Sequence, residues 1–114
     1  MSRPYAPDRG DIVWITFSPH AGHEQGGKRP ALVLSPRAYN DKVGLAVLCP
    51  ITSRVKGFPF EVPLPEGLGP SGVALADQVK SLDWQSRNAE FAATVPAAVV
   101  DDVVAKILSL ISNA

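Results

Sequence analysis

The chain has 114 residues, is 46% hydrophobic and carries a formal net charge of zero. This length predicts a single domain over residues 1–114 with one core. The sequence has neither an apolar run long enough to cross a bilayer nor an N-terminal signal-peptide pattern, so we expect a cytoplasmic protein without a membrane partner. Cys49 is the single cysteine and lies in an apolar run, which predicts a buried thiol with no catalytic role.

The neutral total hides a difference between the two halves of the chain. Residues 1–60 carry eight Lys or Arg against four Asp or Glu, whereas residues 61–114 carry three against seven. If folding gathers the cations of the first half on one face, that face can bind a phosphate backbone. If the halves intermix in space, the difference has no such meaning, and both interpretations stay open at this stage.

Short predicted strands fill most of the chain. After an extended arm over residues 1–9, apolar residues on both parities predict a strand at 12–17 that is covered on both faces. A loop over residues 18–29 follows. Further strands are predicted at 31–35, 44–51, 60–64, 72–77 with a continuation to 82 after a bend, and 91–95. Residues 36–41 suit one helical turn, and Pro63 requires its strand to lie at an edge or to end there.

The hydrophobic period changes near the C-terminus. Between residues 96 and 111 apolar side chains recur at spacings of three and four, which predicts an amphipathic helix packed on the sheet. Pro96 suits the start of that helix. The chain therefore predicts a mainly β (α+β) fold, a small β-barrel with short helices and a C-terminal amphipathic helix. Such barrels serve both binding and catalysis, so function must be argued from particular residues.

The segment from Gly22 to Pro30 has the composition of a functional loop. It combines three glycines with a histidine, a glutamate and two adjacent cations, immediately before a strand. Glycines allow the backbone to approach a ligand closely. Pro30 and the strand behind it would hold Arg29 in a fixed place. We therefore expect the functional residues to lie in and around this loop.

The histidines of the loop suggest two chemistries. His20, His23 and Glu24 could hold a metal ion, but Gly27 stands where the His-Glu-x-x-His pattern needs its second histidine, so we expect no metal site. Alternatively, the two histidines could act as general acid and base, because their pKa values lie nearest to neutrality.

A third chemistry uses Glu24 as the base, Arg29 as the cation that stabilises a charged phosphorus centre, and the Thr52 hydroxyl as a hydrogen-bond donor. Cleavage of RNA through its own 2′-OH needs only these parts, because the nucleophile is already attached beside the phosphate. The structural alternatives are a surface cation for Arg29, a strand-end hydroxyl bonded to its own backbone for Thr52, and charge neutralisation of Lys28 or Arg29 for Glu24.

Motifs spread along the chain carry a family resemblance. They are Gly10-Asp11-x-x-Trp14, Glu24-Gln25-x-Gly27-x-Arg29-Pro30, Ala31-x-Val33-Leu34-Ser35-Pro36, Tyr39-Asn40, Pro50-x-Thr52, Lys56-Gly57-x-Pro59-Phe60-Glu61-Val62 and Gly72-Val73-Ala74-Leu75-Ala76-Asp77-Gln78-Val79-Lys80-Ser81. In this order they resemble the MazF/PemK toxin family, and its MazF branch in particular. The resemblance implies an SH3-like barrel and a homodimeric toxin of a type II toxin–antitoxin system. It further implies metal-independent cutting of single-stranded RNA at short motifs, without a cofactor, leaving 2′,3′-cyclic phosphate and 5′-OH ends.

The same resemblance assigns roles to individual residues. Arg29, Thr52 and Glu24 match the catalytic positions of the family. The loop from Phe17 to Lys28 and four further positions would line the RNA groove, so the residues expected to bind RNA are Phe17, His20, His23, Gln25, Lys28, Asn40, Lys56, Gln78 and Lys80. His20 and His23 have no counterpart in the family pattern, so a role in proton transfer also stays open for them.

The family implies a partner as well, a MazE-like antitoxin whose acidic tail lies over the RNA groove. Two alternatives from other classes remain. One is a toxin of the CcdB type, which has the same general fold and poisons DNA gyrase. The other is a non-catalytic barrel that binds nucleic acid or a peptide. We expect Trp14 in the core or at a dimer interface, and Trp84, which lies among polar residues, is a candidate for contact with a partner.

Overall fold

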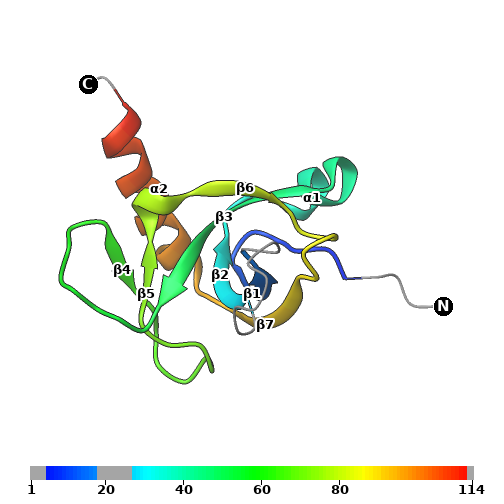
Figure 1. The fold of residues 1–114 in the computed structure, drawn as a ribbon. Helices are drawn as coiled ribbons and strands as arrows, with labels where there is room; N and C mark the ends of the chain where they lie inside the picture. Colours follow the sequence, from blue (N-terminus) through cyan, green and yellow to red (C-terminus); the bar gives the residue numbers. More distant parts are fainter. Residues whose placement is uncertain (1–4, 18–26, 113–114) are drawn as a thin grey trace.

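The computed structural model describes residues 5–17 and 27–112, which form an antiparallel sheet and two α-helices (Figure 1). The strands are β1 (Asp11–Thr16), β2 (Lys28–Val33), β3 (Leu45–Thr52), β4 (Glu61–Pro63), β5 (Val73–Leu75), β6 (Lys80–Asp83) and β7 (Glu90–Thr94). The helices are α1 (Arg37–Val43) and α2 (Ala97–Ile111), with a 3₁₀ turn, η1 (Ala76–Gln78), between β5 and β6. None of the helices in these ranges is long and apolar enough to cross a membrane.

The strands lie in the order β4-β5-β3-β2-β1-β7, and β6 also pairs with β3. Within the described ranges β4 and β7 do not pair with each other, so the sheet is not closed by hydrogen bonds. The prediction of a mainly β fold with short helices and a C-terminal amphipathic helix is confirmed. In the described part of the chain, the predicted barrel is not closed by hydrogen bonds between its end strands. It is an open sheet in which β3 pairs with β2, β5 and β6.

The apolar residues of β1 occur on both parities because the sheet has a core on each side. Ile12 packs in one cluster with Leu32, whereas Val13 and Ile15 pack in a second cluster with Val33. All five side chains are fully buried. Successive side chains of a strand point to opposite faces, so the predicted two-sided burial of this strand is confirmed.

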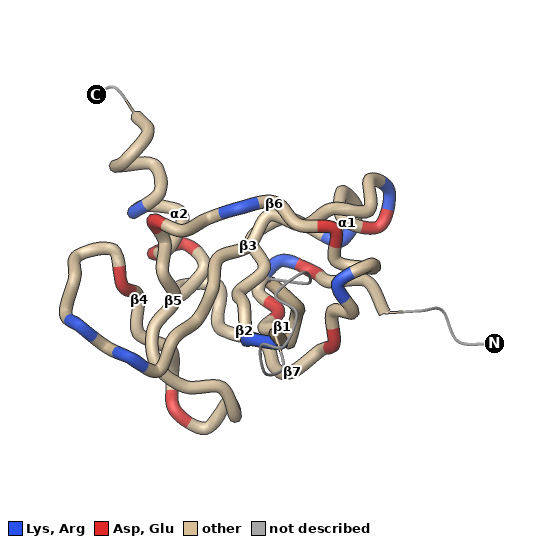
Figure 2. The backbone as a smooth tube through the Cα atoms, in the orientation of Figure 1, with Lys and Arg blue, Asp and Glu red and all other residues tan. Residues whose placement is uncertain are grey.

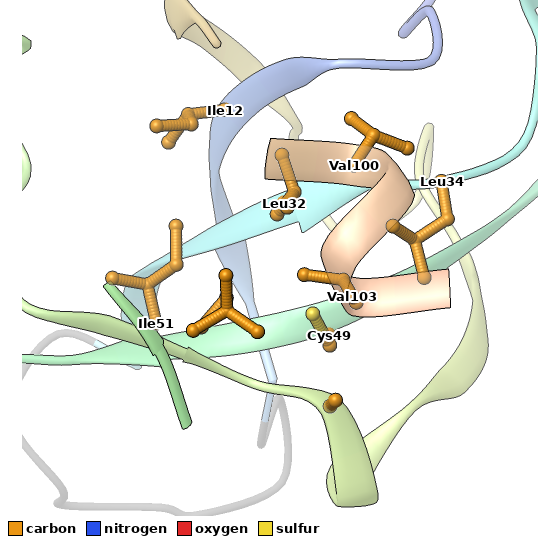
Figure 3. Packing of buried hydrophobic residues seen from close by; sticks show 10 residues of the cluster. Ile12, Leu32, Leu34, Cys49, Ile51, Val100 and Val103 are labelled. Atoms are coloured by element: carbon orange, nitrogen blue, oxygen red, sulfur yellow. The ribbon is translucent and has the colours of Figure 1, made fainter. Parts of the chain in front are cut away.

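Helix α2 covers the first of these two faces. Val100 and Val103 are buried and belong to one hydrophobic cluster with Leu34 and Cys49 (Figure 3). Complete burial of such a side chain contributes about 1.5–3 kcal/mol to stability. Pro96 directly precedes the first residue of α2. A backbone N–H at this position would have no acceptor within the helix, so proline is tolerated there, and the predicted helix start is confirmed.

The second face is covered in part by Trp84. Its side chain is buried, packs with Ala6, and its indole N–H donates to the carbonyl oxygen of Asn40 at 2.9 Å. The prediction that Trp84 is a candidate for contact with a partner is therefore wrong. The ring is buried, and its one polar group, the indole N–H, already has an acceptor inside the protein. Cys49 is buried as predicted, and burial raises the pKa of its thiol to about 12, which keeps the thiol protonated.

The predicted strand over residues 72–82 consists of two strands joined by the expected bend. β5 ends at Leu75, η1 turns the chain, and β6 begins at Lys80; both strands pair with β3. Pro63 is the last residue of β4, the terminal strand of the sheet path. The predicted position of Pro63 at a strand end on a sheet edge is confirmed.

Candidate active site

Arg29 lies within a strand. β2 begins at Lys28, so the ladder with β1 includes Lys28 opposite Thr16 and Arg29 opposite Ile15. The prediction that Lys28 and Arg29 belong to the loop is wrong, because pairing with β1 extends the strand beyond the apolar run. Arg29 is exposed, so a guanidinium group projects to solvent from a backbone that the sheet holds in place.

A cleft of about 640 Å³ brings Arg29 and Thr52 together. Its walls come from β1, β2, the end of β3 and the chain between β4 and β5. The lining residues are Trp14, Arg29, Pro30, Ile51, Thr52, Ser53, Arg54, Gly69, Pro70 and Ser71. Two of the three residues predicted to be catalytic therefore share one cavity, although they lie on different strands.

Thr52 is the last residue of β3 and is half-buried. The Thr52 Oγ1 atom accepts a hydrogen bond from the backbone N–H of Arg54 at 3.1 Å. This is the local backbone contact expected of a strand-end threonine. It occupies an acceptor site of the oxygen and leaves the hydroxyl proton free for donation, so the contact is compatible with a role toward a ligand.

A second cleft, of about 230 Å³, adjoins the first. The lining residues are Thr52, Arg54, Lys56, Phe58, Phe60, Glu61, Leu75, Asp77 and Gln78. Thr52 and Arg54 line both clefts, so the clefts adjoin at these two residues, and we call them together the recess. Lys56 and Gln78, predicted to bind RNA, thus lie beside the residues predicted to be catalytic.

Three other predicted RNA-binding residues lie outside the walls of these two clefts. Lys80 places its Nζ atom 5.3 Å from the centroid of the Phe17 ring, a cation–π distance. Lys28 Nζ lies 2.9 Å from the Glu90 carboxylate, in an ion pair that remains partly exposed. The structure therefore joins Phe17 to Lys80 but does not bring either of them, or Lys28, into the recess of Arg29 and Thr52.

Asn40 cannot bind RNA in this structure, because its side chain is fully buried. The Nδ2 atom donates to the carbonyl oxygens of Pro7 at 2.8 Å and Ser35 at 2.9 Å, and Oδ1 accepts from Ser35 Oγ at 2.6 Å. Every hydrogen of the amide is used inside the protein. The prediction for Asn40 is corrected accordingly: it fixes the N-terminal segment to the start of α1.

Glu24, Gln25, His20 and His23 lie outside the described residues, so their predicted roles stay predictions. In the ranges 5–17 and 27–112, no group of three or more His, Cys, Asp or Glu side chains is arranged to hold a metal ion.

The sequence did not single out Arg54 as a site residue, and it placed Trp14 in the core or at an interface. Trp14 is 37% exposed and lines the first cleft, and Arg54 lines both clefts. The sequence did contain a signal for Arg54: it is a cation only two residues after Thr52, the candidate catalytic threonine, and this spacing could have indicated a site residue.

Some of the cations of residues 1–60, the basic half of the chain, line the recess. Arg29, Arg54 and Lys56 line it, and Figure 2 shows the last two on the loop between β3 and β4. Glu61 and Asp77 of the acidic half line the second cleft with them. The halves of the chain therefore intermix at the second cleft. Among the residues that the structure describes, the first cleft is lined by two arginines and by no carboxylate, which suits binding of an anion.

A guanidinium group, a hydroxyl proton available for donation and an adjoining basic and aromatic recess are suited to an anionic ligand such as a nucleic-acid backbone. Residues 8–111 match the family described as the PemK-like, MazF-like toxin of type II toxin–antitoxin systems. The chain belongs to this family.

Individual relatives agree with this assignment. The chain is 50% identical to the endoribonuclease toxin MazF of Escherichia coli K12 over 97% of this chain and 99% of that protein. It is 31% identical to the endoribonuclease PemK of Escherichia coli over 92% of this chain and 82% of that protein.

Solved structures give the same result. MazF of Deinococcus radiodurans superposes with a TM-score of 0.85 at 61% identity, covering 94% of this chain and 97% of that one. The MazE–MazF complex of the same organism matches with a TM-score of 0.91 at 58% identity, covering 97% and 100%. The predicted family and the predicted class of endoribonuclease toxin are confirmed, and the CcdB-type alternative is not favoured.

Proposed function

We propose that residues 1–114 act as one toxin domain that cuts single-stranded RNA at short sequence motifs in the cytoplasm, inhibiting translation and growth. The observation that carries this proposal is the position of Arg29 and Thr52 in one cleft. Among the described lining residues Arg29 has no carboxylate neighbour, so its guanidinium group is suited to phosphate, and Thr52 supplies a neutral donor in the same cleft.

The proposed reaction is attack by the ribose 2′-oxygen on the adjacent phosphorus. The new P–O2′ bond forms as the P–O5′ bond breaks, giving a 2′,3′-cyclic phosphate and a 5′-OH end. Glu24 accepts the 2′-OH proton, and the leaving 5′-oxygen takes up a proton from water. Arg29 and the Thr52 hydroxyl hydrogen-bond to the phosphate oxygens, on which negative charge increases. The nucleophile belongs to the substrate, so the reaction needs no metal-bound hydroxide, and we propose no cofactor.

We assign RNA binding to the residues around this centre. Lys56 and Gln78 line the adjoining cleft, and Phe17 and Lys80 form a cation–π pair on the neighbouring surface. Unpaired RNA is bound by cations along its backbone and by aromatic rings under its bases, which matches these residue types. Lys28, Gln25, His20 and His23 complete the proposed set.

We also propose that the toxin is a homodimer and that a MazE-like antitoxin with an acidic segment neutralises it. The end of α2 leaves Leu108, Leu110 and Ile111 exposed by 53%, 46% and 73% of their surfaces, an apolar surface suited to a second copy. Light scattering should give the mass of a dimer for the wild type and a lower mass for Ile111→Asp. A wild-type monomer would contradict the proposal.

The cleavage proposal is tested with a long single-stranded RNA in EDTA, with the ends of the products mapped. We expect discrete cuts with cyclic phosphate ends from the wild type, and loss of these cuts in Arg29→Ala. Arg9→Ala is the matched control, because Arg9 is an exposed arginine whose ion pair, with Asp101, lies away from the cleft. Equal cutting by wild type and Arg29→Ala would exclude Arg29 from the mechanism. Absence of cutting by every protein would favour a binding module or a gyrase poison.

A further inference from the structure

The loop between β3 and β4, residues 53–60, presents a large aromatic ring to solvent. Phe58 is 59% exposed, so most of its ring surface is available for contact with a ligand. The loop also carries Arg54 and Lys56, seen as two basic segments in Figure 2. An exposed ring beside two cations is a composition suited to binding unpaired nucleic acid.

The ring of Phe58 is paired with a cation inside the second cleft. Lys56 Nζ lies 5.9 Å from the centroid of the ring, and both side chains line the cleft of about 230 Å³. Asp77 and Gln78 line the same cleft from η1. A carboxylate and an amide can hydrogen-bond to the edge of a base, so the cleft offers both a stacking surface and polar groups for a base edge.

Glu61 holds the loop in this shape. Its Oε1 atom accepts the backbone N–H of Gly57 at 2.9 Å, and its Oε2 atom accepts that of Lys56 at 3.1 Å. The backbone N–H of Glu61 donates to the carbonyl oxygen of Phe58 at 3.1 Å. Gly57 has a φ of +81°, a conformation that glycine adopts without strain. One carboxylate therefore fixes the backbone of Lys56 and the turn that carries Phe58.

The second cleft lies next to the proposed reaction centre, since Thr52 and Arg54 line both clefts. An RNA strand with its reacting phosphate beside Arg29 and Thr52 would continue into the second cleft with a neighbouring nucleotide. We propose that the second cleft is a subsite for one unpaired base of the substrate. The base stacks on Phe58, Lys56 and Arg54 contact the flanking phosphates, and Glu61 is the positioning residue for the loop. This inference rests on the proposed function, because the substrate is the same RNA.

The first test is steady-state cleavage of a single-stranded oligoribonucleotide that contains one mapped cut site. Phe58→Leu should raise KM at least ~5-fold and change kcat less than ~2-fold, since one base–aromatic stack is worth about 1 kcal/mol or more. Phe58→Trp should keep KM near the wild-type value. Val55→Ala is the control, because Val55 is in the same loop, is 61% exposed and lines neither cleft. A KM for Phe58→Leu within ~2-fold of the wild type would overturn the proposal.

The second test separates positioning from direct contact. Glu61→Ala should raise KM as Phe58→Leu does, and the double variant should be no worse than either single variant, because Glu61 acts through the loop that presents Phe58. Glu61→Gln keeps an acceptor oxygen and should recover part of the loss. If the fold-increase in KM of the double variant equals the product of the two single increases, Glu61 and Phe58 act independently, and the positioning role of Glu61 is overturned.

Failure of the proposed function and failure of this inference have different signatures. If the wild type cuts no RNA, the proposed function fails, and the subsite is tested by fluorescence anisotropy with a mixed-sequence 2′-O-methyl oligoribonucleotide. Phe58→Leu should then weaken binding at least ~5-fold, and equal binding would overturn the inference. If Phe58→Leu weakens only the binding of an acidic antitoxin peptide, the cleft is a protein site and the inference is also overturned.

Discussion

Gly72 packs directly against the backbone of Thr52. A Cβ atom on Gly72 would lie 2.0 Å from the carbonyl oxygen of Thr52 and 2.8 Å from the Cα atom of Ser53. Gly72 also has a φ of +112°, which side-chain-bearing residues rarely adopt. Thr52 pairs with Val73 at this point, so β5 approaches the end of β3 only because residue 72 has no side chain. The position of the proposed catalytic hydroxyl therefore depends on the glycine that directly precedes β5, the strand paired with β3 at Thr52.

Gly72→Ala should lower the free energy of unfolding by about 2–4 kcal/mol and displace Thr52, because the added methyl group meets backbone atoms that cannot move independently. Gly67→Ala is the matched control, since Gly67 has a φ of +87° and open space where the Cβ atom would stand. We expect the control to lose about 1 kcal/mol and to keep its cleavage rate. Urea unfolding and single-turnover cleavage measure both effects, and equal losses in the two variants would contradict the role of the close contact.

The Thr52 hydroxyl can be separated from its local structural contact by two substitutions. Thr52→Val keeps the shape but removes the donor, so kcat should fall about 100-fold or more, as for loss of one preorganised donor to a developing charge. Loss of the contact with the Arg54 N–H should cost only about 1 kcal/mol of stability. Thr52→Ser keeps the hydroxyl and should retain kcat within ~10-fold. A destabilised Thr52→Val with unchanged kcat would show that the hydroxyl serves only the turn.

Local patterns in the sequence predicted the parts of the fold that depend on burial. The three-and-four spacing of apolar residues predicted α2, and the two-sided apolar pattern of residues 12–17 predicted β1 with a core on each face. The start of β2 was missed because pairing of Lys28 with Thr16 depends on a strand partner, whereas glycine and charge content alone indicate a loop.

The candidate site was predictable where the family motifs gave residue roles, and the structure adds which of those residues meet. Asn40 shows the limit of this approach. A polar residue in a short polar helix is ordinarily exposed, and its burial depends on Pro7, which lies far away in the sequence. The same holds for Trp84, whose partner is the Asn40 carbonyl oxygen. Such long-range polar contacts leave no periodic signal in the sequence.

Asn40→Ala tests the structural role of this buried amide. The variant removes the Asn40 amide donor from the carbonyl oxygens of Pro7 and Ser35 and the acceptor of the Ser35 O–H, so we expect a loss of about 2–4 kcal/mol in the free energy of unfolding. Cleavage by the fraction that remains folded should keep its kcat and KM. Lys42→Ala, an exposed change on the same helix, should alter stability by less than ~0.5 kcal/mol. A stable Asn40→Ala protein with a raised KM would restore the RNA-binding role.

Cys49 gives the unfolding free energy a defined dependence on alkaline pH. Burial raises the pKa of its thiol from 9.0 to about 12. Above pH 9 the unfolded chain releases this proton while the folded protein keeps it, so the unfolded state binds fewer protons and stability falls as pH rises. The decrease amounts to about 1.4 kcal/mol per pH unit between the two pKa values and is absent well below pH 9.

Comparison of wild type with Cys49→Ala isolates this contribution, because every other titrating group is common to the two proteins. Between pH 7.5 and pH 10.5 the wild type should lose about 2 kcal/mol more than Cys49→Ala in urea unfolding. The alanine variant itself is less stable at pH 7.5, since it removes a buried sulfur from the core beneath α2. The gap between the two proteins should therefore narrow as pH rises. A gap that stays constant would mean that the thiol ionises as readily in the folded protein as in the unfolded chain, which is incompatible with its burial in the cluster that contains Leu32 and Val103.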